Sequence, residues 1–140
     1  MHDEPDIDRE LLSLADFGTP HIAGYSADGK ANGTAMAVES VAKHFRIEPL
    51  LNFFPAKVPA PSNPGVNIDP AAANPLADAV FASYDVADDD AALRAAPERF
   101  EALRGSYRIR REFPAYTVRS DKPLPSPLRD SLLELGFRLA

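Results

Sequence analysis

The stretch YTVRSDKPLPSPLRDSLLELGFRL (residues 116–139) decides the fold, because it contains two short strand patterns on either side of a helix pattern. Residues 116–118 are aromatic and β-branched, as is typical of a strand. Residues 127–135 predict a helix, which Gly136 is suited to end. Residues 137–139 predict a last short strand. The C-terminal part of the chain is therefore expected to form a strand, a helix and a second strand.

Further elements of the same kind precede this stretch. Residues 66–68 alternate in polarity and lie between Gly65 and Pro70, as a strand would. Helices are predicted for residues 71–84 and 97–107, each of which carries apolar side chains at helical spacing. The predicted fold class is α+β, with a small three-stranded sheet and flanking helices.

Three consecutive aspartates, residues 88–90, stand directly before an alanine-rich run. Carboxylates at a helix start accept hydrogen bonds from free backbone amides and suit the helix dipole. We therefore interpret the run as a helix cap, with a metal site as the less favoured alternative. No metal is expected.

The N-terminal part has a different organisation. Asp8 is expected to cap a short helix that ends near Leu14, and residues 28–45 predict a longer helix ended by Pro49. Five prolines between residues 49 and 64 predict a stiff, extended linker. We expect three parts: residues 1–48, a linker at 49–64, and a domain at 65–140.

Composition excludes several classes of function. The chain has 140 residues and a formal net charge of −6, and its longest basic run is Arg110-Arg111, so nucleic acid is not the expected main partner. It has no cysteine, which excludes disulfides and cysteine-bound zinc. There is no membrane-spanning run, and the acidic N-terminus does not resemble a leader peptide. A cytoplasmic location is expected.

Glu4 and His21 lie 17 residues apart, on either side of the first predicted helix. A helix of that size can fold back so that its flanking loops meet at one end. An imidazole titrates near neutrality, and a carboxylate bonded to one ring nitrogen sets its tautomer. The pair is a candidate acid/base catalyst, and the alternative is a solvated glutamate beside a loop histidine.

The surrounding motifs resemble a known family. Asp3-Glu4-Pro5 followed by TPHIAGY (residues 19–25) resembles the end of the catalytic region in D-2-hydroxyacid dehydrogenases. HIAGY followed by GKANGT (29–34) is similar, within that superfamily, to the erythronate-4-phosphate dehydrogenase family. YDVADDDAALR (84–94) and RIRREF (108–113) resemble the C-terminal dimerisation domain of the same family. The likeness covers essentially the whole chain.

The resemblance implies a role for each matching residue. His21 is implied as the proton donor and acceptor, and Glu4 as its carboxylate partner. Gly24 falls where the family brings its backbone close to the cofactor NAD, and Tyr25 falls where the family contacts the substrate. Considered without the resemblance, Gly24 is a turn glycine and Tyr25 a packed aromatic residue.

Two adjacent arginines are candidates for binding a phosphate, because guanidinium groups can grip one with two hydrogen bonds. Arg110, in preference to Arg111, is expected to reach across a homodimer to the substrate in the partner's active site. The alternative for both residues is a solvated charged edge.

No three of the seven glycines form the G-x-G-x-x-G fingerprint that binds a dinucleotide. The resemblance therefore implies the C-terminal part of an NAD-dependent enzyme, inactive alone, in which residues 1–48 end the catalytic and NAD-binding region. The implied reaction oxidises 4-phospho-D-erythronate to 2-oxo-3-hydroxy-4-phosphobutanoate in pyridoxal phosphate biosynthesis. NADP in place of NAD stays open. Alternatives are a stand-alone dimerisation module and, less favoured, a small-ligand sensor of the ACT type.

Overall fold

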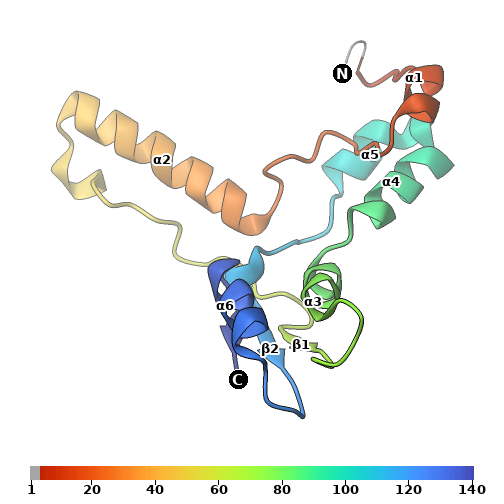
Figure 1. The fold of residues 1–140 in the computed structure, drawn as a ribbon. Helices are drawn as coiled ribbons and strands as arrows, with labels where there is room; N and C mark the ends of the chain where they lie inside the picture. Colours follow the sequence, from red (N-terminus) through yellow and green to blue (C-terminus); the bar gives the residue numbers. More distant parts are fainter. Residues whose placement is uncertain (1–3) are drawn as a thin grey trace.

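The computed structural model of the protein describes residues 4–140. Six α-helices and three short strands follow one another in these residues, and 3-10 turns lie at Glu48–Leu50, Pro97–Arg99 and Phe113–Ala115 (Figure 1). The elements are α1 (Arg9–Leu14), α2 (Ala27–Phe45), β1 (Gly65–Asn67), α3 (Pro75–Ser83), α4 (Val86–Ala95), α5 (Phe100–Gly105), β2 (Thr117–Arg119), α6 (Ser126–Glu134) and β3 (Arg138–Leu139).

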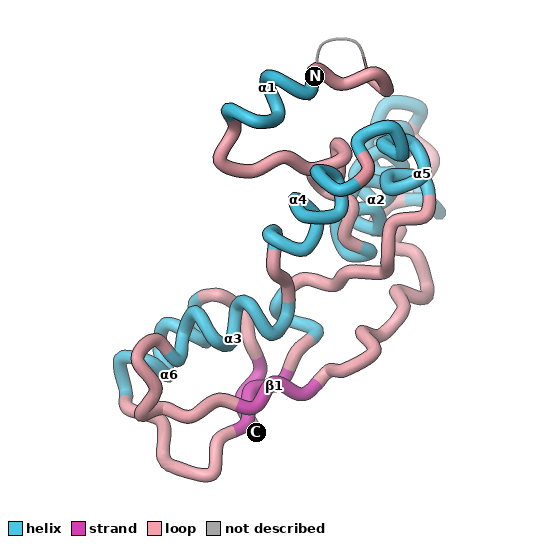
Figure 2. The backbone as a smooth tube through the Cα atoms, turned by 90° about the vertical axis from the view of Figure 1, so that its right-hand side faces the viewer, coloured by secondary structure: helices cyan, strands magenta, loops and turns pink. Residues whose placement is uncertain are grey.

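The three strands form one parallel sheet in the order β1-β2-β3, with Val118 of β2 opposite both Val66 and Leu139. Parallel neighbours require a crossover, which α3–α5 and α6 provide. The helices α3 and α6 contact each other beside the sheet (Figure 2). The predicted small sheet with flanking helices is confirmed. Each observed strand lies within one residue of its predicted position.

The core of this unit is built from buried apolar residues of the sheet and its two helices. Alternation along β1 and β2 buries one side chain per strand, and α6 adds a leucine that is fully buried. Gly136 has a φ of 93°, a backbone conformation that glycine adopts at little cost, and it ends α6 as predicted. The buried cluster comprises Val66, Ile68, Ala79, Tyr116, Val118, Leu132 and Phe137.

Several helix boundaries differ from the sequence prediction. The helix predicted to begin at residue 71 begins at Pro75, because the Asn74 side chain accepts a hydrogen bond from Ala77 N. The helix predicted for residues 28–45 is confirmed at Ala27–Phe45, but the residue that ends it is Arg46, in a left-handed conformation with φ 55°, and not Pro49. Residues 97–107 form a 3-10 turn followed by α5, which ends at Gly105.

The aspartate run is not the cap of α4, so that prediction is wrong. Asp85 is the N-cap and accepts a hydrogen bond from Ala87 N, which places residues 88–90 inside the helix. The three side chains consequently point to different sides of α4. Asp88 is exposed, whereas Asp89 is buried among polar partners.

The helices α4 and α5 lie beside α1, away from the sheet (Figures 1 and 2). The Arg94 guanidinium donates to the carbonyl oxygens of Leu12 and Ala15 at 2.7 and 2.8 Å. Asp90 accepts a hydrogen bond from Gly18 N at 2.7 Å. These contacts attach the segment before α2 to the helices after β1. The division of the chain at residues 49–64 stays a prediction.

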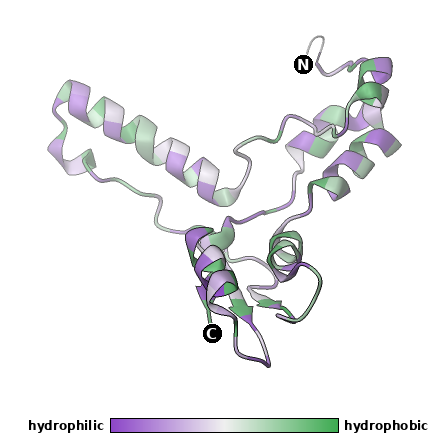
Figure 3. Cartoon of the chain, viewed as in Figure 1, coloured by the Kyte–Doolittle hydropathy of each residue, from purple (hydrophilic) through white to green (hydrophobic). Residues whose placement is uncertain are grey.

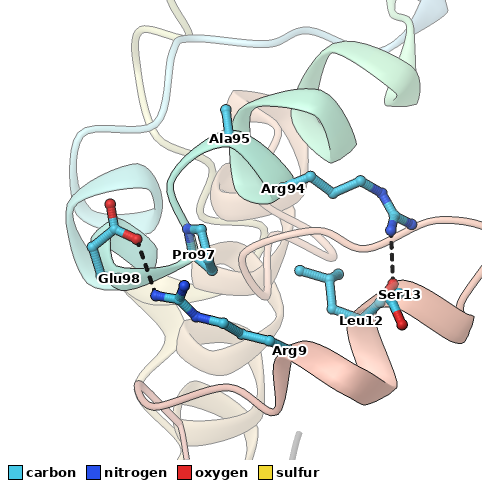
Figure 4. Close-up of a pocket in the computed structure, with 7 residues that line it drawn as sticks. All are labelled: Arg9, Leu12, Ser13, Arg94, Ala95, Pro97 and Glu98. Atoms are coloured by element: carbon cyan, nitrogen blue, oxygen red, sulfur yellow. Dashed lines mark hydrogen bonds and ion pairs between the residues drawn. The ribbon is translucent and has the colours of Figure 1, made fainter.

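A hollow of about 330 Å³ lies between α1 and the end of α4 (Figure 4). An ion pair of 3.4 Å between Arg9 and Glu98 crosses one side of it. Its lining includes none of the residues that the sequence singles out for catalysis or binding: Arg9, Leu12, Ser13, Arg94, Ala95, Pro97 and Glu98. The candidate site therefore lies elsewhere.

The long helix α2 projects away from the other helices (Figure 1), and hydrophobic residues occur along it and along the segment that follows (Figure 3). Met36 is 72% exposed and Phe45 is 67% exposed. The accessible surface is 9500 Å², against roughly 7,100 Å² for a compact monomer of this mass. None of the helices in residues 4–140 combines the length and the apolar composition that a membrane span requires.

Candidate functional site

The loop between α1 and α2 carries the predicted proton-transfer pair. His21 Nδ1 lies 2.8 Å from Glu4 Oε2 and 3.1 Å from Glu4 Oε1. The two flanking loops therefore meet at one end of α1, as the sequence suggests. The hydrogen bond from His21 lowers the pKa of Glu4, which keeps that carboxyl ionised as an acceptor. Asp3, the first residue of the resembling motif, lies outside the described residues.

The backbone holds the His21 side chain toward solvent. Pro20 and Ile22 on either side are buried, and His21 N donates to Thr19 O at 2.8 Å in a tight turn. His21 itself has φ 55°, in the left-handed region that costs a residue with a side chain some energy. The side chain is 55% exposed. The imidazole edge that Glu4 does not occupy is therefore accessible to a small molecule.

Gly24 lies three residues after the histidine and has φ 71°. A Cβ atom at this position would meet no atom within 4 Å, so the backbone here borders open space. Gly29 lies in the first turn of α2, where no side chain fits. A Cβ atom at Gly29 would lie 2.6 Å from Gly24 O. Ser26 is fully buried and caps α2 by accepting from Gly29 N at 2.8 Å. The lack of a side chain at Gly29 thus lets the loop pack on α2.

Tyr25 is held by partners that are distant in sequence. Its hydroxyl oxygen accepts a hydrogen bond of 3.0 Å from Arg104 Nε of α5. The Lys30 ammonium lies 4.1 Å from the ring centroid, and the Tyr107 ring meets it edge-on at 6.2 Å. The hydrogen bond to Tyr25, and to a smaller extent the charge of Glu4, raise the pKa of Arg104. Arg104 is a residue that sequence reasoning missed, since no local pattern connects it to Tyr25.

Tyr107 is fixed in turn by a buried carboxylate. Asp89 Oδ2 accepts hydrogen bonds from the hydroxyls of Tyr107 at 2.7 Å and Tyr84 at 2.9 Å. Burial, followed by the bond to Asp89, raises the pKa of both phenols, which therefore stay protonated donors. A guanidinium nitrogen of Arg108 lies 3.8 Å from Asp89 Oδ1. This aromatic and acidic cluster reaches Tyr25 through the edge-on contact of the Tyr107 ring.

The two candidate arginines have separate structural roles. Arg111 pairs with both carboxylate oxygens of Asp28 at 2.8 and 2.9 Å and also donates to Pro59 O. The Arg110 guanidinium lies 4.2 Å above the Tyr84 ring, and its Nε is buried without a hydrogen-bond partner among the described residues. Both side chains are half-buried, so the alternative of a solvated edge is wrong. Among residues 4–140, no hydrogen bond joins Arg110 to the His21 loop side chains.

The Asp28–Arg111 pair makes stability depend on pH. The hydrogen bond from Arg111 lowers the pKa of Asp28 in the folded chain, so the pair stabilises the fold above the unfolded pKa and this contribution is lost as pH falls through the folded pKa. We expect Asp28→Asn to lower the free energy of unfolding by about 1–3 kcal/mol at pH 7 and by less at pH 3, where the Asp28 carboxyl of the unfolded chain is largely protonated. Urea denaturation at both pH values measures this difference.

Asp121→Asn is the matched control, because Asp121 is exposed and should change stability by less than about 0.5 kcal/mol. An Asp28→Asn effect of equal size at both pH values would contradict a contribution from the ionised pair.

The described residues contain no group of three or more histidine, aspartate or glutamate side chains placed to hold a metal ion.

Comparison with known proteins shows the family to which the chain belongs. Residues 58–136, more than half of it, match the family model described as "Domain of unknown function (DUF3410)". The chain belongs to this family. The matched DUF3410 region begins seven residues before β1 and includes every described element from β1 to α6. It therefore contains Arg104, Tyr107 and Arg110, whereas Glu4, His21 and Tyr25 precede it.

Curated relatives extend the likeness of this DUF3410 chain toward the N-terminus. It is 44% identical over 115 residues to a protein of Bacteroides thetaiotaomicron named erythronate-4-phosphate dehydrogenase, covering 82% of this chain and 31% of that protein. Proteins with the same name from Saccharophagus degradans and Escherichia coli O9:H4 are 39% and 37% identical, over 92% and 96% of this chain and 35% of each relative. The chain thus spans about a third of the relatives' length. The resemblance predicted from the motifs is confirmed.

Proposed function

We propose that this chain is the C-terminal part of an NAD-dependent 4-phosphoerythronate dehydrogenase. The complete enzyme would oxidise 4-phospho-D-erythronate to 2-oxo-3-hydroxy-4-phosphobutanoate, a reaction that serves pyridoxal phosphate biosynthesis in the cytoplasm. The observation that carries the proposal is the 2.8 Å contact between His21 Nδ1 and Glu4 in a chain whose relatives are named for this activity.

The geometry supports the role of proton acceptor for His21. Nδ1 faces the Glu4 carboxylate and donates to it, which leaves Nε2 as the basic nitrogen. Nε2 takes the proton of the substrate hydroxyl. At the same time, the carbon that carries this hydroxyl loses a hydride. Glu4 stabilises the resulting imidazolium, because a carboxylate favours the charged ring. In the reverse direction the same nitrogen returns the proton.

NAD, when bound, supplies the acceptor for the hydride. Gly24 fits a cofactor at this place, since its backbone borders open space and carries no side chain that would keep a flat ring away. The 140 residues contain no dinucleotide fingerprint, so residues outside this chain would hold the nucleotide.

Substrate binding is assigned to Tyr25 and Arg110. Tyr25 lies four residues after His21, and its hydroxyl has a proton to donate to an anionic substrate. Arg110 carries a guanidinium whose Nε lacks a partner among the described residues, which suits a phosphate oxygen. We propose that Arg110 reaches the substrate in the partner subunit of a homodimer formed through residues 65–140.

A stand-alone dimerisation module is the second candidate. Exposed apolar residues within 65–140, such as Phe81 and Ile109, favour it, because such a surface is suited to a protein partner. A stable dimer of the 140-residue chain in sedimentation is compatible with both candidates, whereas monomers or aggregates would exclude the stand-alone module.

Turnover tests the main proposal. The complete protein that contains this chain should reduce NAD when 4-phospho-D-erythronate is added, as measured by absorbance of the reduced nicotinamide. The 140-residue chain alone should show none, because two catalytic side chains without a nucleotide site cannot orient a hydride transfer. Turnover by the chain alone, or none by the complete protein, would refute the proposal.

A further inference from the structure

Arg104 connects the DUF3410 region to the loop that carries His21. Its Nε donates a 3.0 Å hydrogen bond to the Tyr25 hydroxyl across 79 residues of sequence, and both side chains are half-buried. We infer that Arg104 is a positioning residue that directs the Tyr25 O–H toward an anionic oxygen of the substrate. This inference rests on the proposed function and adds a residue from α5 to the site.

The direction of the hydrogen bond follows from the chemistry of the two groups. A guanidinium has five N–H donors and no acceptor, so the Tyr25 oxygen can only accept from Arg104. The hydroxyl proton must then point to another acceptor. Among residues 4–140, Tyr25 donates its hydroxyl to no side chain or carbonyl. The proton is therefore available to a ligand.

Two neighbouring side chains hold the ring of Tyr25 in place. Lys30 covers it at 4.1 Å from the centroid, and the Tyr107 ring contacts it edge-on. Tyr107 is itself held by Asp89 at 2.7 Å. With the ring fixed, the only remaining motion is rotation of the O–H group about the C–O bond. The hydrogen bond from Arg104 restricts this rotation. An oriented O–H group binds an anion with less entropy loss than a rotating one.

The charge around Tyr25 selects an anionic ligand. Arg104 and Lys30 bring two positive charges to the ring and its hydroxyl, which favours a carboxylate or phosphate group. 4-Phospho-D-erythronate carries both groups. A hydroxyl directed by Arg104 would bind ground state and transition state alike, so its loss should appear in KM and leave kcat nearly unchanged.

The test compares arginine variants in the complete protein with NAD and 4-phospho-D-erythronate. Arg104→Met, which removes the donor, should raise KM for 4-phospho-D-erythronate about tenfold, with kcat and KM for NAD changed less than about twofold. Arg104→Lys keeps a cation with donors only and should recover most of the binding. Arg99→Met is the control, because Arg99 is exposed and lies near the start of α5.

A double-mutant cycle separates positioning from general structural support. In the Tyr25→Phe background, Arg104→Met should raise KM by less than about twofold, since the hydroxyl that it directs is absent. A full tenfold effect in that background, or an equal rise of KM for NAD, would overturn the inference. If Arg104→Met does not fold, Arg104→Lys and Arg104→Gln complete the same cycle. An inactive wild-type protein refutes the proposed function as well, whereas wild-type activity with an unchanged Arg104→Met refutes only this inference.

Discussion

Replacing His21 by glutamine in the complete protein should lower kcat for oxidation of 4-phospho-D-erythronate by about 10²–10⁴-fold, the usual contribution of a general base. Glutamine can keep a hydrogen bond to Glu4 but cannot accept the substrate proton near neutral pH. The KM values should change little, because the ring is exposed and supports no packing. Steady-state assays with the purified variant measure the loss.

His44→Gln is the matched control for this substitution. His44 is an exposed histidine on α2 whose ring meets that of Phe45 edge-on. Its loss should leave kcat within about twofold of the wild-type value. Glu4→Gln should reduce kcat by less than His21→Gln, since the imidazole remains and loses only its stabilising charge. A His21→Gln variant with wild-type kcat would rule out the proton-transfer role.

Replacing Asp89 by alanine should destabilise the chain by about 2–5 kcal/mol, because it leaves two partly buried tyrosine hydroxyls without their acceptor. Asp89 is 8% exposed and holds Tyr84 and Tyr107 at 2.9 and 2.7 Å. Urea denaturation of the chain, followed by circular dichroism, measures the change. The loss should also loosen the Tyr107 ring that packs against Tyr25.

The neighbouring residue provides a control of the same chemistry. Asp88 has a side chain that is 68% exposed, so Asp88→Ala should change the free energy of unfolding by less than about 0.5 kcal/mol. Removing both hydroxyls as well, with Tyr84→Phe and Tyr107→Phe, should recover part of the Asp89→Ala loss. Equal effects at Asp88 and Asp89 would show that the buried acceptor contributes nothing specific.

Local sequence patterns predicted the elements better than their boundaries. Asp8 caps α1 and Gly136 ends α6 as expected, because capping involves backbone atoms within a few residues. The prediction chose the wrong cap for α4. The N-cap is Asp85, which lies before the aspartate run and accepts a hydrogen bond from Ala87 N. Several possible caps in one stretch compete, and composition alone does not select between them.

The sequence by itself determined the α+β class, the three strands, and the meeting of Glu4 with His21 across one short helix. Those features depend on periodicity, turn residues and motif spacing, which act over short separations. Tertiary structure alone decided that Arg104 donates a hydrogen bond to Tyr25 across 79 residues and that Arg111 pairs with Asp28 across 83. A side-chain hydrogen bond between distant segments leaves no periodic signal in the sequence, because its geometry exists only after the chain has folded.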